Sequence, residues 1–280
     1  MEGLREIKIS DKEYPSLLKK IKSAPKKLFV LGELKGDEKF FAIVGSRIPT
    51  DYGKAAASFF AKELARAGLC IVSGFAPGID TIAHKSCLEV GGKTVAVLGT
   101  GLDEKSIYPR SNLKLKKEIL EKKGALLSEY PPGTRGTKFT FPQRNRIVAG
   151  MSLGVLVVEA KEKSGALITA AHAFSFKRKV FAVPGSIFSK NSRGTHSLIK
   201  KGAQLVESPE EILQQLNIAP KKEPLSEDNF LLQILDSGPL SLEEIVAKSK
   251  LSVSQVLQTL TLLELEGKVK NLGKNVYCRS

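Results

Sequence analysis

The sequence predicts an α/β fold, a doubly wound parallel sheet, followed by a small C-terminal winged-helix domain. Two observations predict the sheet: short apolar runs alternate with helical segments, and small or polar residues gather where those runs end. A third observation, three helical segments and a hairpin signal after residue 228, predicts the winged helix. At 280 residues the chain is long enough for one large core and one small one.

The first segments of the chain are an arm and a buried strand. Residues 1–38 are expected to form an N-terminal packing arm, in which a helix and a strand lie against the main domain. The first strand of that domain is FAIVG, residues 41–45, an unbroken apolar run typical of a strand buried on both faces. Past Gly45, free helix-start amides, the Ser46 hydroxyl and the Arg47 guanidinium point to one small volume that suits a phosphate. The alternative is an ordinary strand-to-helix turn with a surface arginine.

The rest of the main domain, residues 39–217, repeats the strand–helix rhythm. Further strands are expected at residues 69–74, 94–101, 125–130, 153–160, 180–185 and 203–208, and glycines stop several of the helices between them. The last helix opens with a capping box formed by Ser208 and Glu211. In such sheets ligands bind at the carboxyl ends of the strands. The pocket there is expected to be lined by Gly45, Gly74, Gly78, Gly99, Gly101 and Thr169.

The chain has a net charge of +15, and the residues before Pro224 together carry +16. The 57 residues from Pro224 onward hold six Lys/Arg and seven Asp/Glu, and so contribute a charge of −1. A basic body with a neutral tail favours a polyanionic partner such as nucleic acid, although lysine runs also occur on solvated surfaces. No apolar run approaches membrane length and no signal pattern opens the chain, which predicts a cytoplasmic protein with no membrane partner.

Several common functions of this fold do not agree with the sequence. The first turn reads GSRIPTDYG rather than G-x-G-x-x-G, the second strand lacks a ribose-binding acid, and no P-loop is present, so no nucleotide cofactor is expected. His84, His172 and His196 share no metal-ligand spacing, and the three cysteines are scattered, so no metal is expected. Asp80 and His84 lie four residues apart and are a candidate acid–base pair, although a local helix contact is the commoner cause.

The C-terminal part begins with a linker. Residues 218–228 are polar with two prolines, and residues 229–280 carry the winged-helix pattern. Its second and third helices open with capping boxes at Ser241 and Ser252. The third helix contains no Lys or Arg, whereas a helix that reads a major groove normally carries donors for phosphates and bases. The sequence therefore favours a protein-contact or accessory role for this domain over base readout, and leaves its partner unknown.

The segment KFTFPQRNR, residues 138–146, interleaves cations with two aromatic rings. Proteins hold single strands with cations that follow the backbone and with rings on which bases stack. One of the two phenylalanines is expected to pack down, and the other to be the stacking platform. Arg144 and Arg146 lie two residues apart and cannot face the same way on a helix, so one is expected to grip phosphate and the other to make an internal contact. A hydrophobic lid with solvated charges is the alternative.

Eight blocks of the sequence resemble, in this order, the DNA-processing protein A (DprA/Smf) family. They are VGSR, SGFAPGIDTIAH, VLGTGLDEKSIYP, LLSEYPPG, FPQRNRIVAG, VVEAKEKSGALITA, VFAVPG and GTHSLIKKGAQLV, and the match runs from about Tyr14 to Leu216. The resemblance implies an extended Rossmann-like domain that binds single-stranded DNA and forms dimers. It also implies that the protein passes the strand to the RecA recombinase during natural transformation. We therefore expect a non-enzymatic, cytoplasmic single-strand DNA-binding protein.

The resemblance also carries site residues onto this sequence. Ser46 and Arg47 match the phosphate-binding turn, Lys138 and Phe141 the cation and the base-stacking ring, Arg144 and Asn145 the RNR block, and Gly165 and Ala166 the SG-LIT turn. His196 and Leu205 lie where the dimer contacts of the family fall.

An enzyme is the main alternative. SGFAPGID also resembles the nucleoside-monophosphate phosphoribohydrolases of the LOG type, which use the same phosphate turn. Those enzymes carry a P-G-G-x-G-T-x-x-E block with a catalytic glutamate, and this sequence reads VVEAKEKSGALITA instead. Glu129 and Glu159 remain as lone carboxylates. A transcriptional regulator acting through the winged helix is a third and weaker alternative, because the third helix is acidic near its end.

Overall fold

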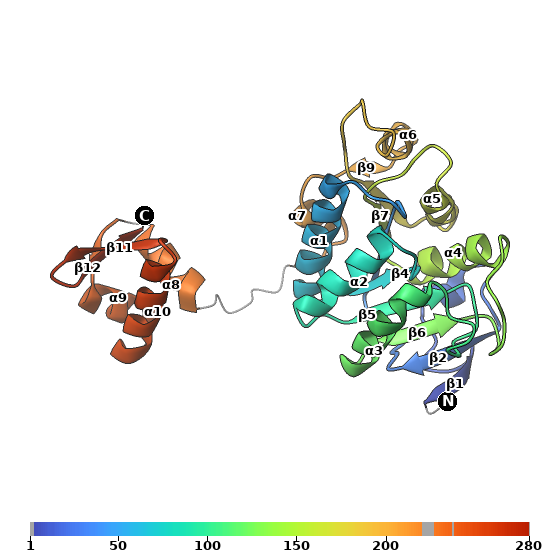
Figure 1. Cartoon of the computed structure of the whole chain (residues 1–280), viewed down its shortest axis with the longest axis horizontal. Helices are drawn as coiled ribbons and strands as arrows, with labels where there is room; N and C mark the ends of the chain where they lie inside the picture. Colours follow the sequence, from blue (N-terminus) through green and yellow to red (C-terminus); the bar gives the residue numbers. More distant parts are fainter. Residues whose placement is uncertain (1–2, 220–226, 237, 280) are drawn as a thin grey trace. The chain divides into compact units, whose positions relative to one another are not determined.

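The computed structural model describes residues 3–219, 227–236 and 238–279, and the chain divides into two compact units, Met1–Lys221 and Lys222–Ser280 (Figure 1). Residues 220–226 of the predicted linker lie outside the described residues. None of the described helices combines the length and the apolar composition needed to cross a membrane.

The first unit is built on a nine-stranded sheet with the order β1-β2-β6-β5-β4-β3-β7-β8-β9. The strands are Leu4–Lys8 (β1), Lys27–Gly32 (β2), Phe40–Val44 (β3), Cys70–Ser73 (β4), Thr94–Leu98 (β5), Ala125–Ser128 (β6), Gly154–Val157 (β7), Lys179–Ala182 (β8) and Gln204–Leu205 (β9). Strands β3 to β9 pair in parallel, while β2 pairs antiparallel with both β1 and β6. The predicted doubly wound, largely parallel sheet is confirmed.

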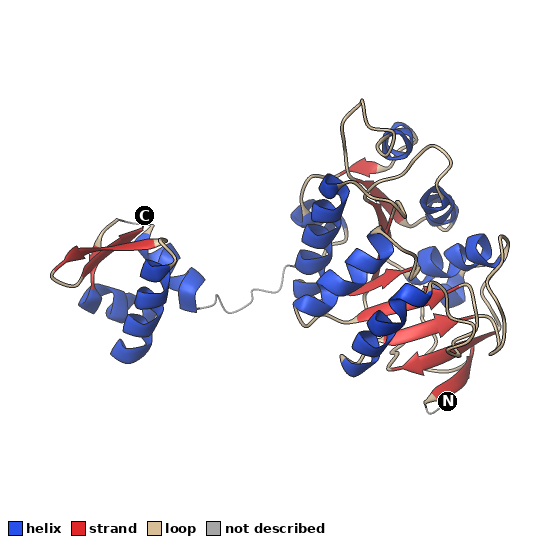
Figure 2. Ribbon diagram, in the orientation of Figure 1, coloured by secondary structure: helices blue, strands red, loops and turns tan. Residues whose placement is uncertain are grey.

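Helices cover both faces of this sheet (Figure 2). They are Asp51–Arg66 (α1), Ile79–Glu89 (α2), Leu113–Glu121 (α3), Thr140–Met151 (α4), Gly165–Ser175 (α5), Arg193–Lys200 (α6) and Pro209–Gln215 (α7). Because successive strand residues point to opposite faces, Phe41 and Ile43 of β3 pack with α1, α2 and α7, whereas Phe40 and Val44 pack on the side of α4 and α5. Every residue of β3 is buried, as the unbroken apolar run predicted.

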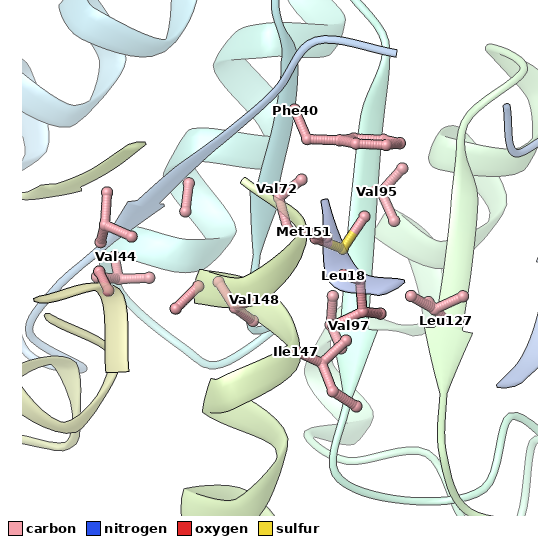
Figure 3. Packing of buried hydrophobic residues seen from close by; sticks show 14 of the residues in the cluster. Leu18, Phe40, Val44, Val72, Val95, Val97, Leu127, Ile147, Val148 and Met151 are labelled. Atoms are coloured by element: carbon pink, nitrogen blue, oxygen red, sulfur yellow. The ribbon is translucent and has the colours of Figure 1, made fainter. Parts of the chain in front are cut away.

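The N-terminal arm differs from the expected helix and strand. It supplies two strands, the edge strand β1 and its antiparallel neighbour β2, and the segment between them is described with a single 3-10 turn, Leu18–Lys20. Leu18 is fully buried among Val95, Val97 and Met151 in the core between β5 and α4 (Figure 3). Burial of one such leucine stabilises a fold by about 1.5–3 kcal/mol, so this turn anchors the arm without needing a longer helix.

The second unit has the predicted winged-helix arrangement. Its elements are Glu227–Leu235 (α8), Leu240–Ser241 (β10), Leu242–Ser249 (α9), Val253–Leu265 (α10), Val269–Gly273 (β11) and Val276–Arg279 (β12). The capping boxes at Ser241 and Ser252 are both present, because each serine exchanges hydrogen bonds with the residue three positions on. Lys274 and Asn275 join β11 to β12, and both have positive φ, which is the backbone conformation of a two-residue hairpin turn.

Candidate nucleic-acid interface

A cavity of about 490 Å³ opens beyond the carboxyl ends of β3 and β7. From β3 the chain first builds β4, β5 and β6 on one side, and then crosses to β7, β8 and β9 on the other, so the loops after β3 and β7 diverge. Such a reversal of strand order leaves a crevice in which ligands bind. All eight residues predicted to bind single-stranded DNA line this cavity: Ser46, Arg47, Lys138, Phe141, Arg144, Asn145, Gly165 and Ala166.

The residues predicted to line the pocket divide into two groups. Gly45, Gly74 and Thr169 do line the cavity, whereas Gly78, Gly99 and Gly101 lie outside its lining. Gly78 has a φ of 82° and packs against the backbone of the Ser46–Arg47 turn, so it supports the cavity from behind. Gly99 supports it too, since a Cβ there would lie 2.9 Å from the ring of Phe141.

The turn after β3 presents Arg47 to the cavity. Ser46 is buried, and its hydroxyl donates to the carbonyl of Ile48 at 2.9 Å and accepts from the amide of Ile48 at 3.2 Å. The hydroxyl therefore holds the turn in shape. Arg47 itself is exposed, and its guanidinium lies 5.9 Å from the centroid of the Phe141 ring, within cation–π range.

Four exposed cations surround the cavity: Arg47, Lys138, Lys161 and Lys163. Among the described residues, none of the four has a carboxylate within ion-pair distance. Lys161 and Lys163 were missed as site residues from the sequence, although they follow β7 at the carboxyl edge of the sheet. Free cations on one concave surface attract polyanions and hold their phosphates.

The start of α5 adds backbone donors to the same surface. The Ser164 hydroxyl caps the helix by accepting from the Ala166 amide at 3.3 Å, and the Asn145 side chain donates to the Gly165 carbonyl at 3.2 Å. A Cβ at Gly165 would meet nothing within 4 Å, so this backbone is open to a ligand. The N-terminus of a helix favours anions through its free amides and its dipole.

Arg144 and Arg146 both make internal contacts, although the sequence predicted that one of them grips phosphate. Arg144 is only 4% exposed and donates to the carbonyls of Gly74 and Val97. Arg146 donates to both oxygens of Glu129, at 2.6 and 2.7 Å. Both guanidinium groups therefore already have partners, and Arg144 forms part of the wall of the cavity.

Asp80 and His84 do not form the candidate acid–base pair, since no hydrogen bond joins them in the described part of the chain. The Asp80 carboxylate accepts from the amides of Gly74 and Ala76 at 3.0 and 3.3 Å. Burial raises the pKa of Asp80, and the charge of Arg144 opposes that rise. The Nδ1 atom of His84 lies 2.7 Å from the Thr94 hydroxyl, and burial lowers the pKa of His84 to about 3. His84 is therefore a neutral core residue at physiological pH.

The two lone carboxylates, Glu129 and Glu159, are also occupied. Glu129 pairs with Arg146, and Glu159 accepts from the amide and the hydroxyl of Thr50 at 2.9 and 2.5 Å. Neither lines the cavity, where Asp80 is the one acid among the described lining residues. Within the described ranges, no cluster of three or more His, Cys, Asp or Glu side chains is placed to hold a metal ion.

His196 and Leu205, the residues predicted to form the dimer interface, lie away from the cavity. His196 is half-buried, with its Nε2 atom 3.1 Å from the carbonyl of Gly185. Leu205 lies on β9, which pairs with β8 alone among the described strands, and is 42% exposed. The sheet therefore ends at an open edge that carries an exposed leucine.

Two family models match the chain. DNA recombination-mediator protein A matches residues 5–217, and the DprA winged helix domain matches residues 211–273. The DNA processing protein DprA of Bacillus subtilis (strain 168) is 45% identical over 219 residues, which is 77% of this chain and 72% of that protein.

Two solved structures share the fold. DNA processing protein A (DprA) from Streptococcus pneumoniae has a TM-score of 0.70 at 42% identity, covering 76% of this chain and 75% of that one. DNA processing protein A from Helicobacter pylori, described for its single-stranded DNA binding mode, has a TM-score of 0.68 at 33% identity, covering 76% of this chain and 95% of that one. The resemblance predicted from the sequence blocks is confirmed.

Proposed function

The chain belongs to the DNA recombination-mediator protein A family, and on that basis we propose that it is a non-enzymatic, cytoplasmic protein that binds single-stranded DNA. The strand lies in the cavity beyond β3 and β7. The observation that carries the proposal is the set of four cations that have no carboxylate partner in the described part of the chain. They surround a cavity whose one described acid, Asp80, is buried and held by backbone amides. The open start of α5 supports the same reading, because it offers a site for a phosphate.

Each predicted residue then has a role that follows from its contacts. Arg47 and Lys138, joined by Lys161 and Lys163, neutralise phosphates, and the Gly165 amide binds one more. The Ala166 amide is bonded to the Ser164 hydroxyl and holds the start of α5 in place beside it. Ser46 and Asn145 hold the two backbone segments that present these groups. The Phe141 ring, beside the Arg47 guanidinium, offers a surface for a base. Arg144 shapes the wall.

The carboxylates of the chain argue against the LOG-type phosphoribohydrolase, because each candidate already has hydrogen-bond or ion-pair partners. Hydrolysis of a glycosidic bond needs a carboxyl group that can reach the sugar. Glu129 and Glu159 lie outside the cavity lining, and Asp80 is buried against the Gly74 and Ala76 amides.

Fluorescence anisotropy with labelled oligo-dT, the matching duplex and two salt concentrations tests the proposal. We expect the chain to prefer the single strand and its affinity to fall with salt, with a log–log slope of about −2 to −3 for four phosphate contacts. Incubation with AMP is expected to release no base. Equal affinity for strand and duplex, or base release from AMP, would contradict the proposal.

The same titration checks the role of the winged helix. Helix α10 bears no Lys or Arg, and Val253, Leu262 and Leu265 lie exposed on it, so we propose that this domain contacts protein rather than DNA bases. The duplex arm of the titration is therefore expected to show weak binding.

We further propose that two copies pair through the edge carrying His196 and Leu205, and that the dimer loads RecA on the bound strand during natural transformation and recombination. The open edge of β9 and the exposed Leu205 support this pairing. A dimer would give the DNA a longer basic track.

Replacing Leu205 with glutamate is expected to convert the dimer to a monomer in sedimentation velocity, because two carboxylates would be desolvated at a shared interface. The variant is expected to slow RecA filament assembly on oligo-dT, while Leu272→Glu, an exposed leucine of β11 outside α10, serves as the matched control. A wild-type monomer at micromolar concentration would rule out the pairing.

A further inference from the structure

The ring of Phe139 is 72% exposed, immediately before α4. Local folding does not require a phenylalanine here. Phe139 occupies the N-cap position of α4, where Ser, Thr, Asp or Asn normally supplies an acceptor, and it makes no side-chain cap. The hydroxyl of Thr137 does that instead, accepting from the amides of Phe139 and Thr140 at 3.2 and 3.1 Å. Neither capping nor burial accounts for this ring.

Phe139 adjoins the DNA cavity through Lys138. The Lys138 side chain lines the cavity, and its Nζ atom lies 5.2 Å from the centroid of the Phe139 ring. The segment is also held in place, because the Thr137 amide donates to the Thr140 hydroxyl at 2.9 Å in return for the bonds described above. An exposed ring and a cation therefore lie side by side at the edge of the cavity, on a backbone segment held by hydrogen bonds.

Phe141, the ring predicted to be the stacking platform, is less open. It is half-buried, with the Arg47 guanidinium 5.9 Å and the Tyr108 ring 5.8 Å from its centroid. Gly99 lies so close that a Cβ there would be 2.9 Å from the ring. Of the two phenylalanines in this segment, Phe141 is half-buried in the cavity lining and Phe139 is exposed outside it.

We propose that Phe139 is a second base-stacking position, outside the cavity, for a nucleobase of the strand that passes Lys138. The inference rests on the proposed single-strand binding and extends it by one base-stacking position. The ring takes the face of an unstacked base, and Lys138 takes a neighbouring phosphate. Since every base has a π-face, this stacking position discriminates single strand from duplex rather than one base from another.

The absence of tryptophan from the whole sequence allows a direct test. In Phe139→Trp the new side chain is the one tryptophan of the protein, and its emission is expected to be quenched on addition of oligo-dT. In Phe188→Trp, whose parent ring is 90% exposed on a loop away from the cavity lining, emission is expected to stay unchanged. Phe139→Ala is expected to weaken oligo-dT binding at least about fivefold with the salt slope unchanged, while Phe188→Ala binds like wild type.

The outcomes separate this inference from the proposed function. If wild type binds oligo-dT, but Phe139→Ala binds equally well and the emission of Phe139→Trp does not change, stacking on Phe139 is ruled out and the cavity remains the binding site. If wild type does not bind oligo-dT, the proposed function fails, and this inference fails with it. A change in salt slope in Phe139→Ala would show that the ring acts by placing Lys138, and would also overturn base stacking.

Discussion

Replacing Arg47 with alanine is expected to weaken binding to oligo-dT by about ten- to a hundredfold at low salt. The guanidinium is exposed, has no carboxylate partner in the described residues, and lies beside Phe141 in the cavity, so its charge is available to the strand. The slope of log affinity against log salt is expected to become shallower by about 0.7, as for one lost phosphate contact. Anisotropy titrations at several salt concentrations measure both quantities.

The matched control is Arg66→Ala. Arg66 ends α1, the helix that begins just after the Arg47 turn, and pairs with Glu63 one turn away as its one described acidic partner. It lies about 22 Å along the helix from the cavity end, so its loss is expected to leave affinity unchanged. Both substitutions are on the surface and are expected to change the free energy of unfolding by less than about 0.5 kcal/mol. If Arg47→Ala binds oligo-dT as tightly as wild type, the turn after β3 does not bind phosphate of the strand, and the AMP hydrolase becomes the leading alternative.

The sheet could be predicted from the sequence because its strands are buried on both faces. Such a strand must be apolar throughout, and the run ending at Gly45 shows this in five letters. The edge strand β1 could not be predicted in the same way. Its sequence, LREIK, contacts a neighbour on one side only and buries just Ile7 fully, so its apolar pattern is too weak to separate it from a loop.

The grouping of the site residues could also be predicted, since the carboxyl ends of parallel strands meet at one edge. Arg47 and Gly165 are more than a hundred residues apart in the chain, yet both line one cavity. The direction in which a side chain turns was not predictable. Arg144 and Phe139 are both in the segment 138–146, but only contacts with β4, β5 and Thr137 decide that the cation is buried and the ring is exposed.

Arg144→Met is expected to lower the free energy of unfolding by about 3–5 kcal/mol at neutral pH, measured by urea denaturation. Methionine keeps most of the volume but leaves the carbonyls of Gly74 and Val97 without their donor, and it removes the positive charge near buried Asp80. The Arg144 guanidinium and the Asp80 carboxylate both lie against Gly74, where an added Cβ would be 2.6 Å from an atom of each.

The loss of stability in Arg144→Met is expected to depend on pH through the titration of Asp80. Burial already raises the pKa of Asp80, and Arg144 is the charge that opposes the rise, so the pKa rises further in Arg144→Met. A carboxyl group with a raised pKa in the folded state favours folding at low pH, and that contribution is lost as the pH rises through the folded-state pKa. The stability difference between wild type and Arg144→Met is therefore expected to shrink as the pH falls from 7 toward the ordinary pKa of aspartate.

The double variant Arg144→Met/Asp80→Asn shows whether Arg144 acts on the fold or on the strand. Asparagine can still accept from the Gly74 and Ala76 amides without a charge, so the second substitution is expected to restore part of the lost stability. If Arg144 only shapes the cavity wall, affinity for oligo-dT recovers together with stability, and the salt slope equals that of wild type. A double variant that is stable but still binds weakly, with a slope shallower by about 0.7, would show that the Arg144 guanidinium turns outward and contacts phosphate when the strand is bound.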